Sequence, residues 1–187
     1  MRPNLLVNRY AKAFLELAIQ NNLVDKALDD LLIVKSTIEG NKELDSLIHQ
    51  PFVSKERKTN IMNRLFTDRV EKITLNLINL LIEKNRDTAI TYLYDEYRML
   101  YLEYKKIAVV TITSAIEIDE KTTDRIVNIL KYKIVDKDTI EIKNVIDKSI
   151  IGGFIVKYND YVYDASVTHT LKRLHSDFEE NLFVKGY

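Results

Sequence analysis

The sequence predicts a mostly α fold, with an N-terminal six-helix bundle followed by a small α+β C-terminal domain. Only 4 glycines and 2 prolines occur among 187 residues, which favours long helices over a turn-rich β fold. Apolar residues recur every three or four positions as far as about residue 104, and β-branched residues in alternation follow. We therefore expect two domains, residues 1–105 and residues 106–187.

The first helix is predicted to have one apolar and one polar face. Pro3 suits a first helical turn, where its missing N–H leaves no hydrogen bond unmade. The residues that share the apolar face at helical spacing are Leu6, Tyr10, Ala13, Phe14, Leu17 and Ala18. Because Arg9, Lys12 and Glu16 fall on the other face, this helix is expected to pack along one side.

Three further helices are expected, each with a recognisable end. The second covers residues 24–38 and stops at Gly40, since glycine ends helices at little conformational cost. A short third helix, residues 44–49, ends before Pro51. The fourth starts at Ser54, whose hydroxyl can accept hydrogen bonds from the first free backbone N–H groups.

The fifth helix, residues 70–82, carries two apolar stripes. One stripe comprises Ile73, Leu77, Leu80 and Leu81, and the other comprises Leu75, Ile78 and Ile82. A helix that is apolar nearly all round either lies in the centre of a bundle or has a partner on one side, and both interpretations stay open. The sixth helix, residues 87–104, has tyrosines at helical spacing, which suits the edge of a core.

The C-terminal domain is predicted from a change of period at residue 107. Residues 107–116 and 139–146 are expected to form strands, with a helix at residues 119–133 between them. A hairpin with a two-residue turn at Asn159 follows. A last helix, which Ser166 can cap, carries apolar residues at helical spacing: Val167, Leu171, Leu174, Phe178 and Leu182.

The composition excludes several classes of function. The 28 basic and 28 acidic residues balance along the whole chain, so a nucleic acid is not expected as a partner. There is no cysteine, which excludes disulfides and thiolate metal sites. The N-terminus lacks the apolar run of a signal peptide, and no stretch approaches the roughly 18 apolar residues of a membrane span. Membrane association is therefore expected only through a partner.

The sequence offers little for catalysis or for cofactor binding. None of the common nucleotide, hydrolase or metalloprotease motifs occurs. His175 and Glu179 stand four apart and form a candidate metal pair, but a surface ion pair is the favoured interpretation. Gly152-Gly153 lacks the lysine and the hydroxyl residue of a phosphate loop and is expected to make a close backbone contact beside a strand. We expect no catalytic residue, no cofactor and no metal.

Three stretches in register resemble a known family. They are Arg-Tyr-Ala-Lys-Ala-Phe at residues 9–14, Leu-Leu-Ile-Glu-Lys-Asn-Arg at 80–86, and Asp-Lys-Ser-Ile-Ile-Gly-Gly-Phe-Ile-Val at 147–156. Their order and spacing resemble the delta subunit of the F-type ATP synthase, called the oligomycin-sensitivity-conferring protein in mitochondria. Lys148 stands where that family usually has proline, and Asn159 where it usually has glycine. Asparagine tolerates a left-handed backbone, so these departures concern local turn geometry.

The resemblance implies a non-catalytic stator subunit, present in one copy per complex. It implies that the first domain docks on the N-terminal helices of the alpha subunits of the catalytic head. The second domain would engage the b-type subunits of the peripheral stalk, so that proton-driven rotation is coupled to ATP synthesis. The expected location is peripheral, at the cytoplasmic face of a bacterial membrane, or at the stromal face of the thylakoid if the gene belongs to a plastid.

The resemblance also implies a groove between the first and fifth helices that receives an alpha-subunit helix. Such docking needs apolar anchors at helical spacing. The partner-binding residues expected from the apolar faces of these two helices are Tyr10, Ala13, Leu17, Leu75, Ile78 and Ile82. Three alternatives remain: a helical adaptor in an unrelated assembly, an RNA-binding helical domain, which the even charge disfavours, and an enzyme with an unrecognised site.

Overall fold

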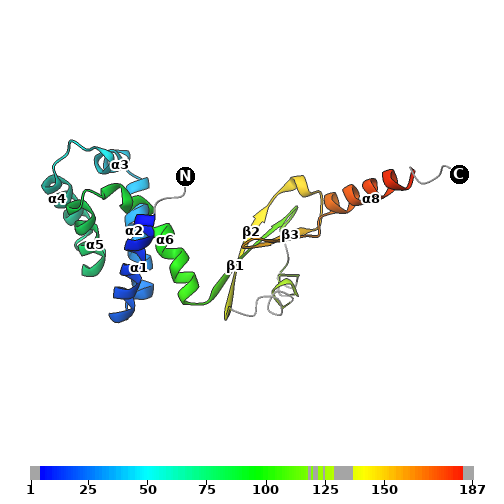
Figure 1. Ribbon diagram of the computed structural model, residues 1–187, viewed down its shortest axis with the longest axis horizontal. Coiled ribbons are helices and arrows are strands. Elements are labelled where there is room, and N and C mark those ends of the chain that lie inside the picture. The colour runs from blue at the N-terminus through cyan, green and yellow to red at the C-terminus, as the bar shows by residue number, and fades with distance from the viewer. Residues whose placement is uncertain (1–4, 118, 120–121, 124, 129–136, 183–187) are drawn as a thin grey trace. The chain divides into compact units, whose positions relative to one another are not determined.

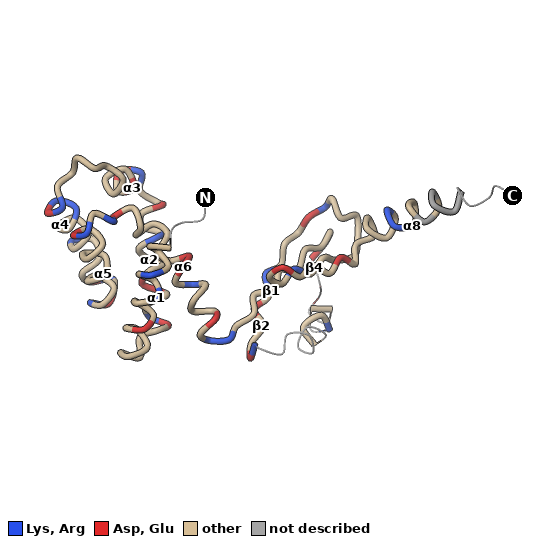
Figure 2. The backbone as a smooth tube through the Cα atoms, in the orientation of Figure 1, with Lys and Arg blue, Asp and Glu red and all other residues tan. Residues whose placement is uncertain are grey.

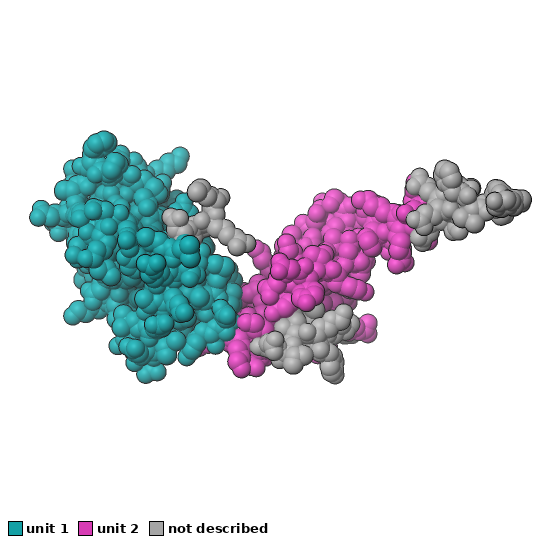
Figure 3. Space-filling model, viewed as in Figure 1, with its two compact units in different colours: residues 1–104 teal, residues 105–187 magenta. Residues whose placement is uncertain are grey.

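The computed structural model shows a mostly helical chain with a small four-stranded sheet in its C-terminal part. It describes residues 5–117, 119, 122–123, 125–128 and 137–182. The chain divides into two compact units, residues 1–104 and residues 105–187 (Figure 3). This division lies one residue from the domain boundary expected from the sequence.

Unit 1 is helical throughout (Figure 1). Its helices are α1 (Leu5–Gln20), α2 (Val24–Glu39), α3 (Lys42–His49), α4 (Lys55–Phe66), α5 (Lys72–Glu83) and α6 (Ile90–Tyr104), with a 3-10 turn at Asp87–Ala89 before α6. The expected helical turn at Pro3 lies outside the described residues.

Local chemistry sets the ends of these helices. The predicted stop at Gly40 is confirmed, since its N–H donates to the carbonyl of Ser36 at 2.9 Å. The predicted cap at Ser54 is also confirmed, since its hydroxyl accepts from the N–H of Arg57 at 3.4 Å. Asn41, which was not predicted as a cap, caps α3 by accepting from the N–H groups of Glu43 and Leu44. Each cap pairs N–H or carbonyl groups that a helix end leaves free.

The core of unit 1 forms where α6 packs against α1 and α2. Tyr97 of α6 is fully buried, with its ring 5.4 Å from the ring of Phe14. Its hydroxyl donates to the carbonyl of Val24 at 3.1 Å, which satisfies the one polar atom of the side chain. Burial raises the pKa of this hydroxyl above its usual value, so it stays a donor at neutral pH.

Unit 2 is built on a sheet with strand order β2-β1-β3-β4. The strands are β1 (Ile107–Ser114), β2 (Thr139–Ile146), β3 (Phe154–Tyr158) and β4 (Tyr161–Asp164). Because β1 and β2 are parallel, the chain between them must cross over. Within the helix predicted at residues 119–133, residues 122–123 and 125–128 are helical, and residues 129–133 lie outside the described part.

The core of unit 2 is small. Residues of β1 alternate between buried and half-buried, and every second one faces the core. The buried apolar residues of this core are Ala108, Val110, Ile112, Ile126 and Val156. Helix α8 (Val167–Leu182) follows β4, and its predicted cap is confirmed because the Ser166 hydroxyl accepts from the N–H of His169 at 3.1 Å.

Much of the apolar surface of unit 2 stays uncovered by the chain itself. On α8 the exposed apolar side chains recur at steps of four, three and four: Val167, Leu171, Leu174 and Phe178. A stripe with this spacing is typical of a helix that packs on another helix. Four of the five apolar residues predicted on the last helix are therefore exposed, and the side chain of the fifth, Leu182, lies outside the described residues.

Candidate docking surface

The predicted site residues of α1 lie along one stripe that runs from half-buried to exposed. Tyr10 is half-buried and packs against the core, Ala13 is exposed, and Leu17 is 41% exposed. Positions three and then four apart lie on one side of a helix, so these three residues form a continuous line. Ala13 and Leu17 are open to a partner in the chain as it stands.

The predicted site residues of α5 are mostly in the core. Ile78 is 0% exposed and Ile82 is 2% exposed, and Leu75 is half-buried. A partner could touch Ile78 or Ile82 only if the helices moved apart. The apolar residues of α5 that stay at least partly open to solvent are Leu80, at 40% exposed, and Ile73 and Leu75, which are both half-buried.

Two hydrogen bonds show which way α5 is turned. Thr74 faces α2, where its hydroxyl donates to Asp30 at 3.0 Å. Asn79 faces α4, where its amide donates to Asn63 at 3.0 Å. Each residue turns the helix by about 100°, so Ile73 and Leu80 share the edge of the buried face opposite Asn79. In Figure 1, α4 lies on one side of α5 and α1 on the other.

Leu75 lies next to Asn79 on the α4 side of α5, away from Ile73 and Leu80. The open apolar residues of α1 and of the α5 edge away from α4 form a candidate docking strip, here called the docking strip: Ala13, Leu17, Ile73 and Leu80. The first two were predicted from the sequence. The other two belong to the stripe of α5 for which no partner was predicted. Only the position of α4 shows which apolar stripe of α5 is open to solvent, and this position cannot be read from the sequence.

Asp30 fixes the start of α5 from another helix. Its side chain is completely buried, and one carboxylate oxygen accepts from the N–H of Glu71 at 2.7 Å as well as from the Thr74 hydroxyl. Lys26 approaches the other carboxylate oxygen at 3.4 Å. Glu71 is the first residue before α5 and gives no side-chain cap, so Asp30 supplies the cap from α2.

The end of α5 is closed by a left-handed residue. Asn85 has φ of 54°, and its N–H donates to the carbonyl of Ile82 at 3.1 Å. The N–H of Arg86 reaches back to the carbonyl of Leu81 at 2.8 Å. This pair of bonds is a Schellman motif, and it fixes the backbone from which the Arg86 side chain departs.

Arg86 joins this end of α5 to α1. Its Nη1 donates to the hydroxyl of Tyr10 at 2.7 Å, and its guanidinium carbon lies 5.5 Å from the centre of the Tyr10 ring. Both side chains are half-buried, where a charged hydrogen bond and a cation–π contact are stronger than in open water. Arg86 belongs to the second sequence motif, but no pattern in the sequence indicates its contact with Tyr10.

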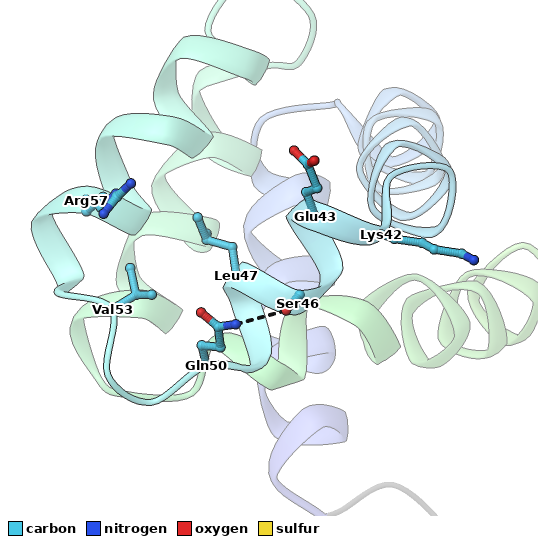
Figure 4. Close-up of a pocket in the computed structure, with 7 residues that line it drawn as sticks. All are labelled: Lys42, Glu43, Ser46, Leu47, Gln50, Val53 and Arg57. Carbon is cyan, nitrogen blue, oxygen red and sulfur yellow. Dashed lines mark hydrogen bonds between the residues drawn. The ribbon is translucent and has the colours of Figure 1, made fainter.

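A pocket of about 430 Å³ lies between α3 and the start of α4 (Figure 4). It is lined by Lys42, Glu43, Ser46, Leu47, Gln50, Val53 and Arg57. Gln50 donates to the Ser46 hydroxyl at 3.0 Å across its floor. The lining carries both signs of charge and opens to solvent, so it favours no particular ligand chemistry.

Charged residues of both signs alternate along the described parts of both units (Figure 2). Within those parts, no three His, Asp or Glu side chains gather as a metal site would require. The predicted pair of His175 with Glu179 is untested, because the side chain of Glu179 lies outside the described residues. Among the described helices, none has the length and apolar character that crossing a membrane requires.

Apolar residues open to solvent on two helices of one unit, together with an uncovered apolar helix face on the other, are typical of a protein that binds other proteins. These two surfaces indicate a protein of the connector class, which binds other proteins through both units. The chain belongs to the ATP synthase delta (OSCP) subunit family, whose sequence profile matches residues 6–178. It is therefore a delta-type stator subunit that acts as a connector in an F-type, membrane-associated ATP synthase.

Relatives match over nearly their full length. The ATP synthase subunit delta of Flavobacterium psychrophilum is 36% identical over 169 residues, which cover 89% of this chain and 92% of the relative. The sodium ion specific subunit delta of Ilyobacter tartaricus is 37% identical over 163 residues, covering 87% and 92%. A chain of the Toxoplasma gondii mitochondrial ATP synthase hexamer has the same fold, with a TM-score of 0.67, 20% identity and coverage of 94% and 98%.

Proposed function

We propose that the chain joins the catalytic head of the synthase to the peripheral stalk. Unit 1, with its six helices, docks on the N-terminal helices of the alpha subunits, and unit 2 engages the b-type stalk subunits. One copy per complex holds the head still while the rotor turns, so that proton-driven rotation is coupled to ATP synthesis. The observation that carries this proposal is the exposed docking strip on α1 and α5.

The docking strip suits one amphipathic helix. Ala13 and Leu17 are one helical turn apart on α1, and Ile73 and Leu80 are two turns apart on α5. A helix laid on this strip contacts small and apolar side chains from both sides, as helix-in-groove docking requires. Tyr10 flanks the strip on α1, and Ile78 and Ile82 support it from the core. Leu75 lies on the α4 side of α5, and contact of Leu75, Ile78 or Ile82 with a partner remains a prediction.

Calorimetric titration of the purified chain with an alpha-subunit N-terminal peptide of roughly 20 residues tests this surface. We expect saturable one-to-one binding. Ala13→Arg and Leu80→Asp each place a charge on the strip, where a docked helix would desolvate it, and should weaken binding at least about 10-fold. Leu32→Asp is the matched control, because Leu32 is a similarly exposed leucine on α2.

Ile78→Asp serves a different purpose in the same experiment. A carboxylate at a fully buried position has no partner, so this variant should unfold unit 1 instead of weakening binding selectively. A folded Ile78→Asp chain that fails to bind would return Ile78 to the contact surface. Equal affinity of Ala13→Arg, Leu80→Asp and the original chain would contradict docking on this strip.

The exposed stripe of α8 supports the stalk-binding role of unit 2. Its steps of four, three and four residues suit pairing with a long stalk helix in a coiled-coil manner. Leu171→Glu should abolish co-purification with a soluble b-type stalk segment. Ser176→Glu lies on the opposite side of α8 and should leave it intact. Loss of co-purification in both variants, or in neither, would argue against this face.

The remaining parts of the proposal concern chemistry and location. We expect no ATP turnover by the isolated chain, and turnover that follows the chain through purification would contradict this. We place the chain at the cytoplasmic face of a bacterial membrane, or at the stromal face of the thylakoid in a plastid, held there only by the complex. In flotation with vesicles, the chain alone should therefore stay in the protein fraction.

A further inference from the structure

The docking strip spans two different helix pairs. α1 packs mainly on α6 and α2, whereas α5 packs mainly on α4. A docked helix must touch both α1 and α5, so the strip keeps its shape only if the two pairs are held at a fixed spacing. Asp30 already ties α5 to α2 at the start of α5. The other end of α5 needs its own tie to α1.

We propose that Arg86 is the positioning residue that holds α1 at the end of α5 through Tyr10. This inference rests on the proposed docking of an alpha-subunit helix on unit 1. Arg86 acts without touching the partner: its guanidinium donates to the Tyr10 hydroxyl and lies over the Tyr10 ring, 76 positions away in sequence. The strip is then formed before the partner arrives, and preorganisation of this kind increases affinity.

The backbone explains why an arginine at this position reaches α1. Asn85 takes the left-handed conformation, and the Arg86 N–H returns to the carbonyl of Leu81. Arg86 also begins the 3-10 turn that leads into α6, because its carbonyl accepts from the N–H of Ala89 at 2.9 Å. Because its main chain is held on both sides, the direction in which the side chain leaves the backbone is fixed, and only side-chain rotamer freedom is lost when Arg86 binds Tyr10.

Tyr10 thereby has a different role from Ala13 and Leu17. Its hydroxyl is used within the chain, as acceptor for Arg86, and its ring is half-buried against the core. If Tyr10 instead bound the partner directly, the loss of its hydroxyl and the loss of Arg86 would weaken binding independently. A double-mutant cycle distinguishes these two roles, because residues that act through one contact do not add.

The experiment measures peptide affinity and thermal midpoint for Tyr10→Phe, Arg86→Gln, the double variant and Arg86→Lys in the full chain. Loss of a charged hydrogen bond that shapes the strip should raise the Kd about 10-fold in Arg86→Gln. The double variant should bind no more weakly than Arg86→Gln alone. Arg86→Lys retains the charge and one donor and should recover part of the affinity.

Two controls separate positioning from general stability. Tyr97→Phe removes a buried hydrogen bond in the same unit, so it should lower the thermal midpoint and leave the Kd unchanged. Arg64→Gln removes an exposed arginine on α4 and should change neither. A Kd that follows the thermal midpoint across all variants would overturn the positioning role.

The outcomes also separate this inference from the proposed function. A chain that binds the peptide, with Arg86→Gln binding equally well, overturns the role of Arg86 and leaves the docking strip in place. Independent, multiplying effects of Tyr10→Phe and Arg86→Gln overturn it as well. Failure of the unaltered chain to bind the peptide removes the proposed docking and the role of Arg86 together.

Discussion

Asp30 shows how one buried carboxylate organises a surface some distance away. It accepts the Glu71 N–H and the Thr74 hydroxyl at the start of α5, inside the core. Asp30→Ala leaves the buried Thr74 hydroxyl and the part-buried Glu71 N–H without this acceptor, so unit 1 should lose about 1–3 kcal/mol of unfolding free energy. Urea denaturation followed by circular dichroism measures this loss. Asp29→Ala, at the exposed neighbour, should cost almost nothing, and an equal loss in both variants would contradict the capping role.

Lys58 is a second buried charge whose contacts cross between elements. Its Nζ donates to the carbonyl of Ile48 at 2.8 Å and pairs with the carboxylate of Asp87. Lys58→Met leaves that carboxylate largely buried without a counter-charge, which should cost about 3 kcal/mol. Lys58→Met with Asp87→Leu removes both charges and should recover much of that loss. Greater destabilisation in the double variant than in the single one would show that the pair is not coupled.

At the scale of elements, Gly153 allows the backbone just before β3 to lie close to the backbone just before α8. Its φ is +78°, and a Cβ placed there would lie 2.3 Å from the carbonyl oxygen of Ala165. Gly153→Ala must therefore shift backbone, and unit 2 should unfold at a clearly lower temperature. In Gly152→Ala the added Cβ would meet only the Val167 side chain, at 3.2 Å, so this variant should be milder. Equal midpoints would contradict a backbone clash.

Two carboxyl groups near these segments, those of Asp147 and Asp164, make the stability of unit 2 sensitive to acid. The pKa of Asp147 lies below its usual value because the side chain and then the backbone N–H of Ser149 donate hydrogen bonds to its carboxylate. Ser166 lowers the pKa of Asp164 in the same way. A carboxyl with a lower pKa in the folded chain stabilises the fold above its unfolded pKa of about 3.9, and this stability is lost as pH falls through the folded pKa. Unit 2 should therefore weaken below about pH 4.

The test compares the thermal midpoint of unit 2 at pH 5 and at pH 3 in the original chain and in Asp147→Asn with Asp164→Asn. Asparagine keeps an acceptor oxygen at both positions but has no proton to gain, so the double variant should lose less stability between the two pH values. An unchanged loss would place the acid sensitivity in other groups.

The helices and strands were largely predictable because their ends depend on local chemistry. Gly40, Ser54 and Ser166 end or cap helices as expected, and β2 has the predicted bounds of residues 139–146. The facing of α5 was not predictable. Both of its stripes are apolar, and only the packing of α4 beside Asn79 shows that Ile78 and Ile82 are turned inward and Leu80 outward.

Contacts between side chains far apart in the chain could not be predicted from the sequence either. The pairs Asp30 with Thr74 and Arg86 with Tyr10 join residues that are 44 and 76 positions apart. No local pattern links such residues, because each pair depends on how whole helices pack. Family resemblance identified the motif that ends in Arg86 but gave no role to that side chain.

At the scale of the whole molecule, the chain has two separate cores of unequal size. Unit 1 buries the apolar side chains of six helices, including α6, whose last residue is Tyr104. The core of unit 2 is a small cluster, and several of its large apolar side chains stay exposed. Less buried apolar area means less stabilisation, so the two units are expected to differ in stability.

Calorimetry of the full chain should therefore show two transitions, with unit 2 unfolding at the lower temperature. A fragment of residues 1–105 should reproduce the upper transition and bind the alpha-subunit peptide with the affinity of the full chain, because the docking strip and the contacts of Asp30 and Arg86 all lie within it. Addition of a b-type stalk segment should raise only the lower transition, since a ligand stabilises the unit that it binds. A single cooperative transition in the full chain, or a 1–105 fragment that fails to fold, would mean that the two cores depend on each other.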